Sequence, residues 1–329
     1  MKNFKLGIKL IGGFSLTALI ALIIGLTGIF TMRDLSGRIE SMGDQSLPSV
    51  EHLLRIKGSV SDLTTSLRTL LSSELNAQDR KDIPAQIQAI RETYKKSADA
   101  YSALPHDADE AALWKEAQAT LSNLAGINNK ALGLNERLVE LDIMSPDELM
   151  GKLQQFRGDH YKLMTDTAKL LVTGEKFDGG TDHTACGFGK WFSGYSTANP
   201  KFKEALEAAF PVHKAFHETI HEIKEHAAAG RTQEAQETYK KVLPTAEGVF
   251  TQFRVMRGQA EEAQKAFNEM GELLMVESKS GQDKLERVML EAVDLTTRKS
   301  AQEAAVGRSE ATRAMTVASV GVVLGVRYL

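Results

Sequence analysis

The longest apolar stretch of the chain lies near its beginning. Residues 10–32 carry no charged side chain, and Lys2, Lys5 and Lys9 precede them. About 20 apolar residues suffice for a helix to cross a bilayer, and basic flanking residues stay in the cytoplasm. A cleaved signal peptide would instead have a shorter apolar core and a cleavage site made of small residues. We therefore expect residues 1–9 to be a cytoplasmic basic flank and residues 10–32 to be a transmembrane helix.

A second apolar stretch closes the chain. Residues 314–326 are uncharged and rich in valine, but these 13 residues are too few to cross a bilayer as one helix. We interpret residues 314–329 as a truncated second transmembrane helix, with a helix end that lies at a surface as the alternative. The first interpretation places residues 33–313 outside the cytoplasm.

Between these stretches, apolar residues recur at three- and four-residue steps, the period of amphipathic helices. A stripe that follows the predicted membrane helix comprises Leu47, Val50, Leu53 or Leu54, Val60, Leu63, Leu67 and Leu70. Further helices are predicted over residues 85–102, 109–141, 146–172 and 232–313, and from residue 202 to a turn near residue 230. Pro244 interrupts the last of them. No window alternates apolar and polar residues over a strand's length, so the pattern predicts an all-α protein of long antiparallel helices.

Local signals refine two boundaries of this pattern. Ser145 and Pro146 are typical of the cap and the first position of a helix. Residues 173–200 contain six of the chain's 26 glycines. We expect loop and short helices there.

Composition supports helices and gives little support to other classes of protein. Helix-favouring residues such as Ala, Leu, Glu, Lys and Gln are abundant in the 329 residues. The net charge of -3 and the lack of a basic stripe give no support for nucleic-acid binding. Cys186 is the single cysteine, so an intramolecular disulfide is impossible. Its thiol is a buried inert group, a metal ligand or a redox group.

Four of the eight histidines fall in one predicted helix, in the segment FPVHKAFHETIHEIKEH. One candidate metal-binding pair is the HxxxH pair of His213 and His217. The other is the HExxH pattern of zinc hydrolases, in which His217 and His221 would bind zinc and Glu218 would be the base. On a helix, His213 lies at the edge of the apolar stripe, His217 about 40° further round and His221 about 40° beyond that. Ligands of an internal metal must face other helices, so this geometry favours His213 and His217.

The hydrolase interpretation has further requirements. It needs a third ligand on another segment and usually a strand edge that holds the substrate. Because the pattern predicts no sheet, we expect the protein not to be an enzyme and keep the pattern of His217, Glu218 and His221 as the less favoured alternative.

Other candidate ligands lie upstream. His160 falls on an apolar helical stripe, which places it in the core as a ligand or as a hydrogen-bonded core residue. Cys186 precedes a predicted short helix, whose N-terminus favours the thiolate that binds zinc; a small buried hydrophobe is the alternative. His183, three residues earlier, is a competing ligand or a solvated loop residue.

These residues occur in a distinctive order. HYKL at residues 160–163 is followed after 22 residues by CGFGKW, and after a further 21 by HKAFH at residues 213–217. The arrangement resembles the chemoreceptor zinc-binding domain of bacterial sensory proteins, which we assign to residues 146–255. The resemblance implies four zinc ligands: His160, Cys186, His213 and His217. Three imidazoles and one thiolate also suit tetrahedral Zn²⁺ on chemical grounds.

The resemblance implies roles for neighbouring residues as well. Leu163, Phe188, Gly189 and Trp191 would support the metal site, the glycine through close backbone approach and the aromatic residues as core anchors. Members of this family are linked to sensing zinc or oxidants such as hypochlorous acid, which makes Cys186 a candidate redox sensor. Many of these domains are cytoplasmic, whereas this one lies between two apolar segments, which implies a periplasmic site.

The rest of the chain resembles the ligand-binding region of methyl-accepting chemotaxis receptors. This implies a membrane-anchored antiparallel helical bundle, in which residues 33–145 are the first part and residues 256–313 the returning helix. The zinc-binding domain, a four-helix unit, is inserted between them. We expect a homodimer through the bundle helices, in the bacterial inner membrane, that signals to a cytoplasmic output half not contained in this chain. The alternative is the input domain of a histidine kinase or nucleotide cyclase with a purely structural zinc.

Overall fold

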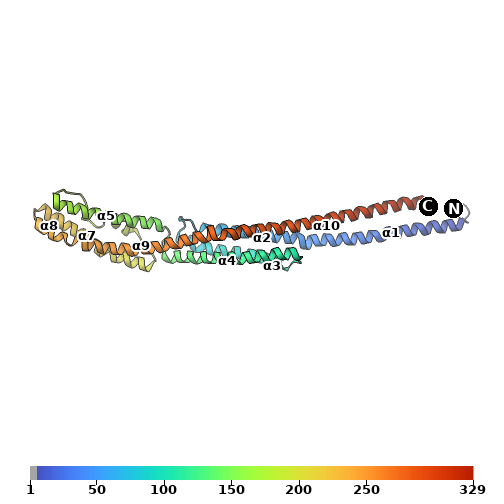
Figure 1. Ribbon diagram of the computed structural model, residues 1–329, viewed down its shortest axis with the longest axis horizontal. Helices are drawn as coiled ribbons and strands as arrows, with labels where there is room; N and C mark the ends of the chain where they lie inside the picture. Colours follow the sequence, from blue (N-terminus) through green and yellow to red (C-terminus); the bar gives the residue numbers. More distant parts are fainter. Residues whose placement is uncertain (1–5, 329) are drawn as a thin grey trace. The chain divides into compact units, whose positions relative to one another are not determined.

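A computed structural model describes residues 6–328 of the chain, and every regular element in this range is a helix (Figure 1). The elements are α1 (Leu6–Ser41), η1 (Met42–Ser46), α2 (Leu47–Thr69), α3 (Ala77–Ala103), α4 (Ala108–Leu141), α5 (Pro146–Thr173), α6 (Gly187–Gly194), α7 (Pro200–Ala228), α8 (Thr232–Tyr239), α9 (Val242–Glu272), η2 (Leu273–Glu277) and α10 (Ser278–Tyr328). The prediction of an all-α fold is confirmed. Lys2 and Lys5 of the predicted cytoplasmic flank lie outside the described residues.

Contacts divide the chain into two compact units. The first takes Met1–Leu63, Ala89–Asn123 and Gly281–Leu329, and the second takes Thr64–Gln88 and Leu124–Ser280. The second unit therefore combines the whole predicted zinc-binding domain with portions of α2, α3 and α4.

The first unit is a bundle formed by parts of α2, α3, α4 and α10, together with α1. Its core residues include Leu53, Ile56, Tyr101, Trp114, Leu285 and Met289, all of them buried. The rings of Tyr101 and Trp114 meet edge to face at 4.8 Å, and Trp114 Nε1 donates to Ser102 Oγ at 2.9 Å. A buried indole thus has its single donor satisfied, as a tightly packed helical core requires.

The first residue of the stripe predicted for α2, Leu47, does not belong to the buried face. Leu47 is 68% exposed, while Leu53 and Ile56 are buried and Leu54 is exposed. The π-helical turn η1 immediately precedes Leu47. The stripe lies wholly after this turn, and the buried positions of α2 begin with Ser49 and Leu53.

One helical stretch among the described residues, Leu6–Thr69, contains a segment long and apolar enough to cross a membrane by length and composition. That segment has a mean hydropathy of 2.2, and none of it is buried within the protein. Within the first unit this stretch contacts the apolar end of α10, where Gly321 faces Ile20 and Ile24.

The second unit is built around three long helices. α7 packs along α9, α5 packs on both, and the short α8 fills the fourth position against all three. The prediction of one interrupted helix over residues 232–313 is wrong at its start, because α8 and α9 are separate helices. The break falls at Lys240 and Lys241. Pro244 sits in the first turn of α9, where the missing N–H breaks no helical hydrogen bond.

Arg80 is the largest fully buried side chain of the second unit that carries a charge. Its guanidinium donates to the carbonyl oxygens of Leu70 and Ser72 at 2.9 and 3.0 Å and to Asn135 Oδ1 at 3.2 Å. Carbonyls at a helix C-terminus carry partial negative charge, which compensates the cation. The helix predicted over residues 85–102 starts earlier than expected, since α3 begins at Ala77.

Candidate metal centre

His160 is positioned by the amphipathic pattern of α5. The buried residues of this helix include Leu149, Leu153 and Phe156, and His160 continues the same stripe at 2% exposure. His160 Nδ1 donates to the Phe156 carbonyl at 2.7 Å, one helical turn back. This bond fixes the tautomer and leaves Nε2 buried without a partner among the described residues. A buried nitrogen with a free lone pair calls for a ligand.

His213 and His217 come from successive turns of α7. Both are about 1% exposed, as are Phe216, Ile220 and Ile223 on the same face. The two Nε2 atoms lie 3.0 Å apart. His217 Nδ1 donates to the carbonyl of Gly180 at 2.8 Å, so its Nε2 is also the nitrogen left for a ligand.

Cys186 is the N-cap of α6. Its Sγ accepts from the Gly189 N–H at 3.2 Å and lies 3.2 Å from His213 Nε2. The thiol hydrogen is directed to the carbonyl of His183, at 3.5 Å. The sulfur thus sits where the helix N-terminus favours a negative charge, facing the two histidines of α7.

The structure brings the four predicted ligand residues together. One ligand atom from each of His160, Cys186, His213 and His217 lies within 4.8 Å of all the others. Two nitrogens on a tetrahedral zinc, each about 2.0–2.1 Å from the ion, would be roughly 3.3 Å apart. The Nε2 atoms of His213 and His217, 3.0 Å apart, are close to that spacing. Three imidazoles with one thiol are also a donor set that zinc prefers. The residues therefore fit a closed four-coordinate zinc site, although their role as ligands stays a prediction.

Burial sets the protonation of this cluster. It lowers the pKa of His160, lowers the pKa of His213 to about 2 with help from the neighbouring His217, and lowers the pKa of His217 to about 4. The imidazoles are therefore neutral near pH 7, the form that binds a metal. Burial also raises the pKa of the Cys186 thiol, and this effect outweighs the N–H groups of Gly189 and Phe188, which lower that pKa. A cation at this position would supply the charge that favours the thiolate.

The residues expected to support the site surround it closely. A Cβ at Gly189 would overlap the carbonyl oxygen of His183, so only glycine allows this approach. Phe188 is buried, and its ring stands perpendicular to that of His213 with centroids 4.9 Å apart. Trp191 packs on Phe156 at 5.5 Å, and Leu163 lies against Gly180.

The competing candidates lie away from the cluster. His221 is on the exposed side of α7, where Nε2 faces Glu225 at 3.4 Å. Glu218 is also exposed and pairs with Lys214 at 3.6 Å. The ring of His183 is 6.1 Å from that of His213, and His183 contributes its carbonyl rather than its imidazole.

Sequence reasoning missed two carbonyls that orient the histidines, those of Phe156 and Gly180. The first follows from the helix itself, since a histidine of this rotamer reaches back one turn. The second belongs to a loop in which Gly179 and Gly180 have φ of 73° and 80°. The adjacent glycines were the available signal, because such left-handed backbone favours glycine.

Comparison with known families agrees with this geometry. Residues 160–224 match a family described as the chemoreceptor zinc-binding domain. The chain contains a chemoreceptor zinc-binding domain. Residues 3–137 match a second family, described as a four helix bundle sensory module for signal transduction. The zinc-binding domain thus follows a sensory module of the chemoreceptor type, and the resemblance found from the sequence is confirmed.

Broader comparisons add nothing to this assignment. Neither the search of curated proteins nor the search of solved structures gives a significant match. The zinc-binding domain and the sensory module therefore rest on the two family matches and on the site geometry described above.

Proposed function

We propose that this chain is the sensory region of a bacterial transmembrane receptor, most directly a chemoreceptor, in which a His₃Cys zinc site is part of the sensing device. The observation that carries the proposal is the convergence of His160, Cys186, His213 and His217 inside a chain that also contains a sensory bundle module. Zinc bound there would supply a fixed positive charge that stabilises the Cys186 thiolate.

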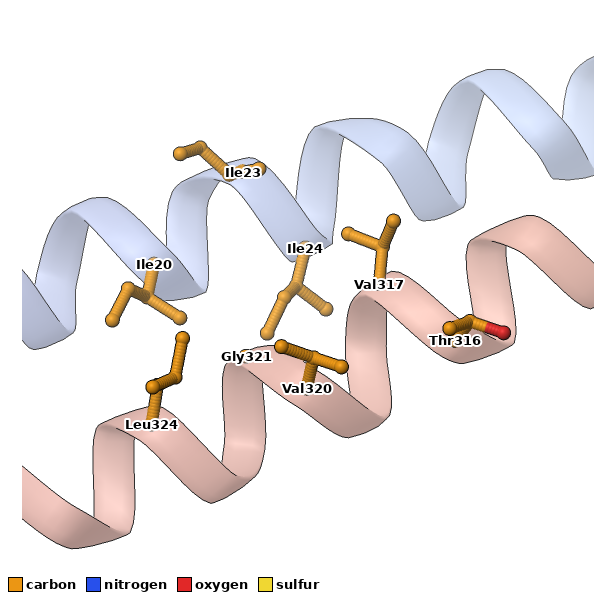
Figure 2. Close-up of a pocket in the computed structure, with 8 residues that line it drawn as sticks. All are labelled: Ile20, Ile23, Ile24, Thr316, Val317, Val320, Gly321 and Leu324. Carbon is orange, nitrogen blue, oxygen red and sulfur yellow. The ribbon is translucent and has the colours of Figure 1, made fainter.

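Membrane anchoring is the first part of this proposal. The apolar part of α1 would span the inner membrane, leaving residues 33–313 in the periplasm. The apolar end of α10 supports a second membrane segment, because it packs closely on α1. Figure 2 shows the groove between the two helices, lined by Ile20, Ile23, Ile24, Thr316, Val317, Val320, Gly321 and Leu324.

The site is placed so that a change in it would alter helix packing. His160 belongs to α5, whereas His213 and His217 belong to α7, and both helices pack on α9. α9 continues through η2 into α10, the helix with the second apolar segment. Loss of a zinc ion bound by His160, His213 and His217 would remove a link between α5 and α7. Signalling by this route requires two discrete packings of these helices.

Oxidation of Cys186 is one candidate signal that would act on the zinc site. The thiolate and hypochlorous acid give a sulfenic acid and chloride, so the sulfur loses two electrons to the chlorine. The oxidised sulfur is a weaker ligand than the thiolate. Changing zinc concentration is the second candidate input, and both act on the same four residues.

A purely structural zinc is the rival candidate. Four protein donors close the coordination sphere and leave no open position, as in sites that only stabilise a fold. The same input region would also serve a histidine kinase or a nucleotide cyclase. In each case the receptor would form a homodimer through its bundle helices. It would signal to an output domain in the cytoplasm. The exposed position of His221 favours these candidates over a zinc hydrolase.

Distance measurements between α5 and α9 test the sensing proposal. Spin labels would be attached to the full chain at exposed Lys162 and Arg257 through unnatural amino acids, since Cys186 must remain free. The proposal predicts that the distance distribution changes on zinc removal, and that hypochlorous acid produces the same change in the zinc-loaded protein. In Cys186→Ala, which has no thiol to oxidise and is expected to bind no zinc, hypochlorous acid should cause no further change. An unchanged distribution in both treatments would identify the zinc as structural.

A further inference from the structure

The loop between α5 and α6 contacts the ring of His217 through the backbone carbonyl of Gly180. The Gly180 carbonyl accepts the hydrogen bond of His217 Nδ1 at 2.8 Å. A metal-binding histidine is oriented by the partner of its other nitrogen, and loss of such a partner weakens metal binding. The position of this loop therefore bears directly on the geometry of His217.

Lys224 holds this loop from the opposite side. It lies seven residues after His217, two turns along the same face of α7. Its Nζ donates to the carbonyls of Phe177 at 2.7 Å and Gly179 at 2.9 Å. The same ammonium lies 4.2 Å from the centroid of the Phe177 ring, a favourable cation–π distance. One side chain thus binds the carbonyls of two residues in this loop, and the second of these residues directly precedes Gly180.

The loop needs such a restraint. Gly179 and Gly180 both have positive φ, and glycine is the residue with the most backbone freedom. Leu163 limits Gly180 on one side, since a Cβ there would lie 2.5 Å from Leu163 Cδ1. Lys224 supplies the polar restraint on the carbonyl side. The other lysine in this part of α7, Lys214, pairs with Glu218 at the surface.

We propose that Lys224 is a positioning residue for the metal centre. By holding the Phe177 and Gly179 carbonyls, its ammonium sets the Gly180 carbonyl against His217 and thereby keeps His217 Nε2 directed at the ion. The inference rests on the proposed zinc function, and its readouts are the zinc affinity and the protection of the His217 ring N–H.

The test compares Lys224→Met with the surface control Lys214→Met and the conservative variant Lys224→Arg, all in the full chain in detergent. Zinc affinity is measured by competition with a chelator of known affinity. Loss of a residue that orients a ligand typically weakens metal binding about 10- to 100-fold. We expect a loss of that size for Lys224→Met, a smaller one for Lys224→Arg, whose guanidinium can still donate to both carbonyls, and none for Lys214→Met.

A second readout separates positioning from general destabilisation. In the metal-free protein, Lys224→Met should speed solvent exchange of the His217 Nδ1 proton, followed by NMR of protein with ¹⁵N-labelled histidine, while His160 Nδ1 stays protected. If circular dichroism shows that Lys224→Met is unfolded, Lys224→Gln is used instead. Wild-type zinc affinity and unchanged His217 exchange in these variants would overturn the proposal. Wild-type protein that binds no zinc would instead refute the proposed function, whereas the exchange measurement would still report on Lys224.

Discussion

Gly189 determines the shape of the Cys186 turn. Its N–H donates to the sulfur, and its Cα faces the His183 carbonyl with no room for a side chain. Gly189→Ala must therefore displace the backbone that carries the Cys186 sulfur. Overpacking of this kind costs about 1–3 kcal/mol. We expect that loss in the free energy of unfolding, together with weaker zinc binding, by denaturant titration and chelator competition. Gly194→Ala is the matched control, because nothing lies within 4 Å of its added Cβ; equal effects would contradict this role.

The buried histidines predict how stability depends on pH. In the folded chain the pKa of His213 is about 2 and that of His217 about 4, both below the unfolded value near 6.5. Below about pH 6.5 the unfolded state binds protons that the folded state does not, so stability falls as the pH decreases. The contribution of His217 is lost by about pH 4, and that of His213 continues to fall toward about pH 2. Urea titrations of the metal-free protein would measure this loss. Replacing both histidines with Leu should flatten the profile; a profile that stays equally steep would assign the effect elsewhere.

At the scale of single residues, the sequence predicted the four converging side chains well. Their order and spacing, together with the helical stripes, place His160 and the HxxxH pair on buried faces. It did not predict the bonds that orient them. The Gly180 carbonyl and the Lys224 ammonium depend on the path of an irregular loop, and loop paths follow no residue period.

Gly321 governs the contact between the apolar helices α1 and α10. A Cβ at this glycine would lie 2.6 Å from Ile24 Cδ1 and 3.1 Å from Ile20 Cγ2. Small residues allow helices to approach closely in an apolar environment, so Gly321→Leu should separate these helices. We expect faster amide hydrogen exchange over residues 314–326 in detergent, measured by mass spectrometry. Gly28→Leu on α1 is the control, because a Cβ added at Gly28 meets nothing within 4 Å. An effect of Gly321→Leu no larger than that of this control would contradict the packing.

Arg80 joins α2, α3 and α4 in the second unit. Arg80→Met would leave the Leu70 and Ser72 carbonyls without their donor, and each unsatisfied buried group costs about 1–3 kcal/mol. We therefore expect a loss of about 2–5 kcal/mol in the free energy of unfolding by chemical denaturation. Lys81→Met changes an exposed neighbour and should be nearly neutral. Similar losses in both variants would show that the buried hydrogen bonds carry little stability.

Helix boundaries followed from local signals where those signals were strong. Pro146 is the first residue of α5, and α7 ends at the polar turn near residue 230. Both boundaries are close to the predicted positions. The sequence failed at the π-turn before Leu47 and at the break before α9. A π-turn leaves no residue signature of its own, and Pro244 marks a helix start as readily as an interruption.

At the scale of the whole molecule, the chain combines a sensory bundle with a zinc-binding domain in an all-α fold. The sequence suggested that the zinc-binding part begins near residue 146. The compact unit that contains it comprises Thr64–Gln88 and Leu124–Ser280. Contacts such as those of Arg80 join segments distant in sequence, and an amphipathic pattern identifies a buried face without naming the helix that covers it.

The zinc content of the protein tests whether His160, Cys186, His213 and His217 bind a metal ion. The full chain, purified in detergent and dialysed against zinc and then against zinc-free buffer, would be measured by elemental analysis beside Cys186→Ala, His213→Ala and His221→Ala. We predict one zinc per wild-type chain, a loss of that zinc in Cys186→Ala and His213→Ala, and its retention in His221→Ala. Wild-type protein without zinc would contradict the His₃Cys site, and loss of zinc in His221→Ala would move the metal to the other pair of histidines.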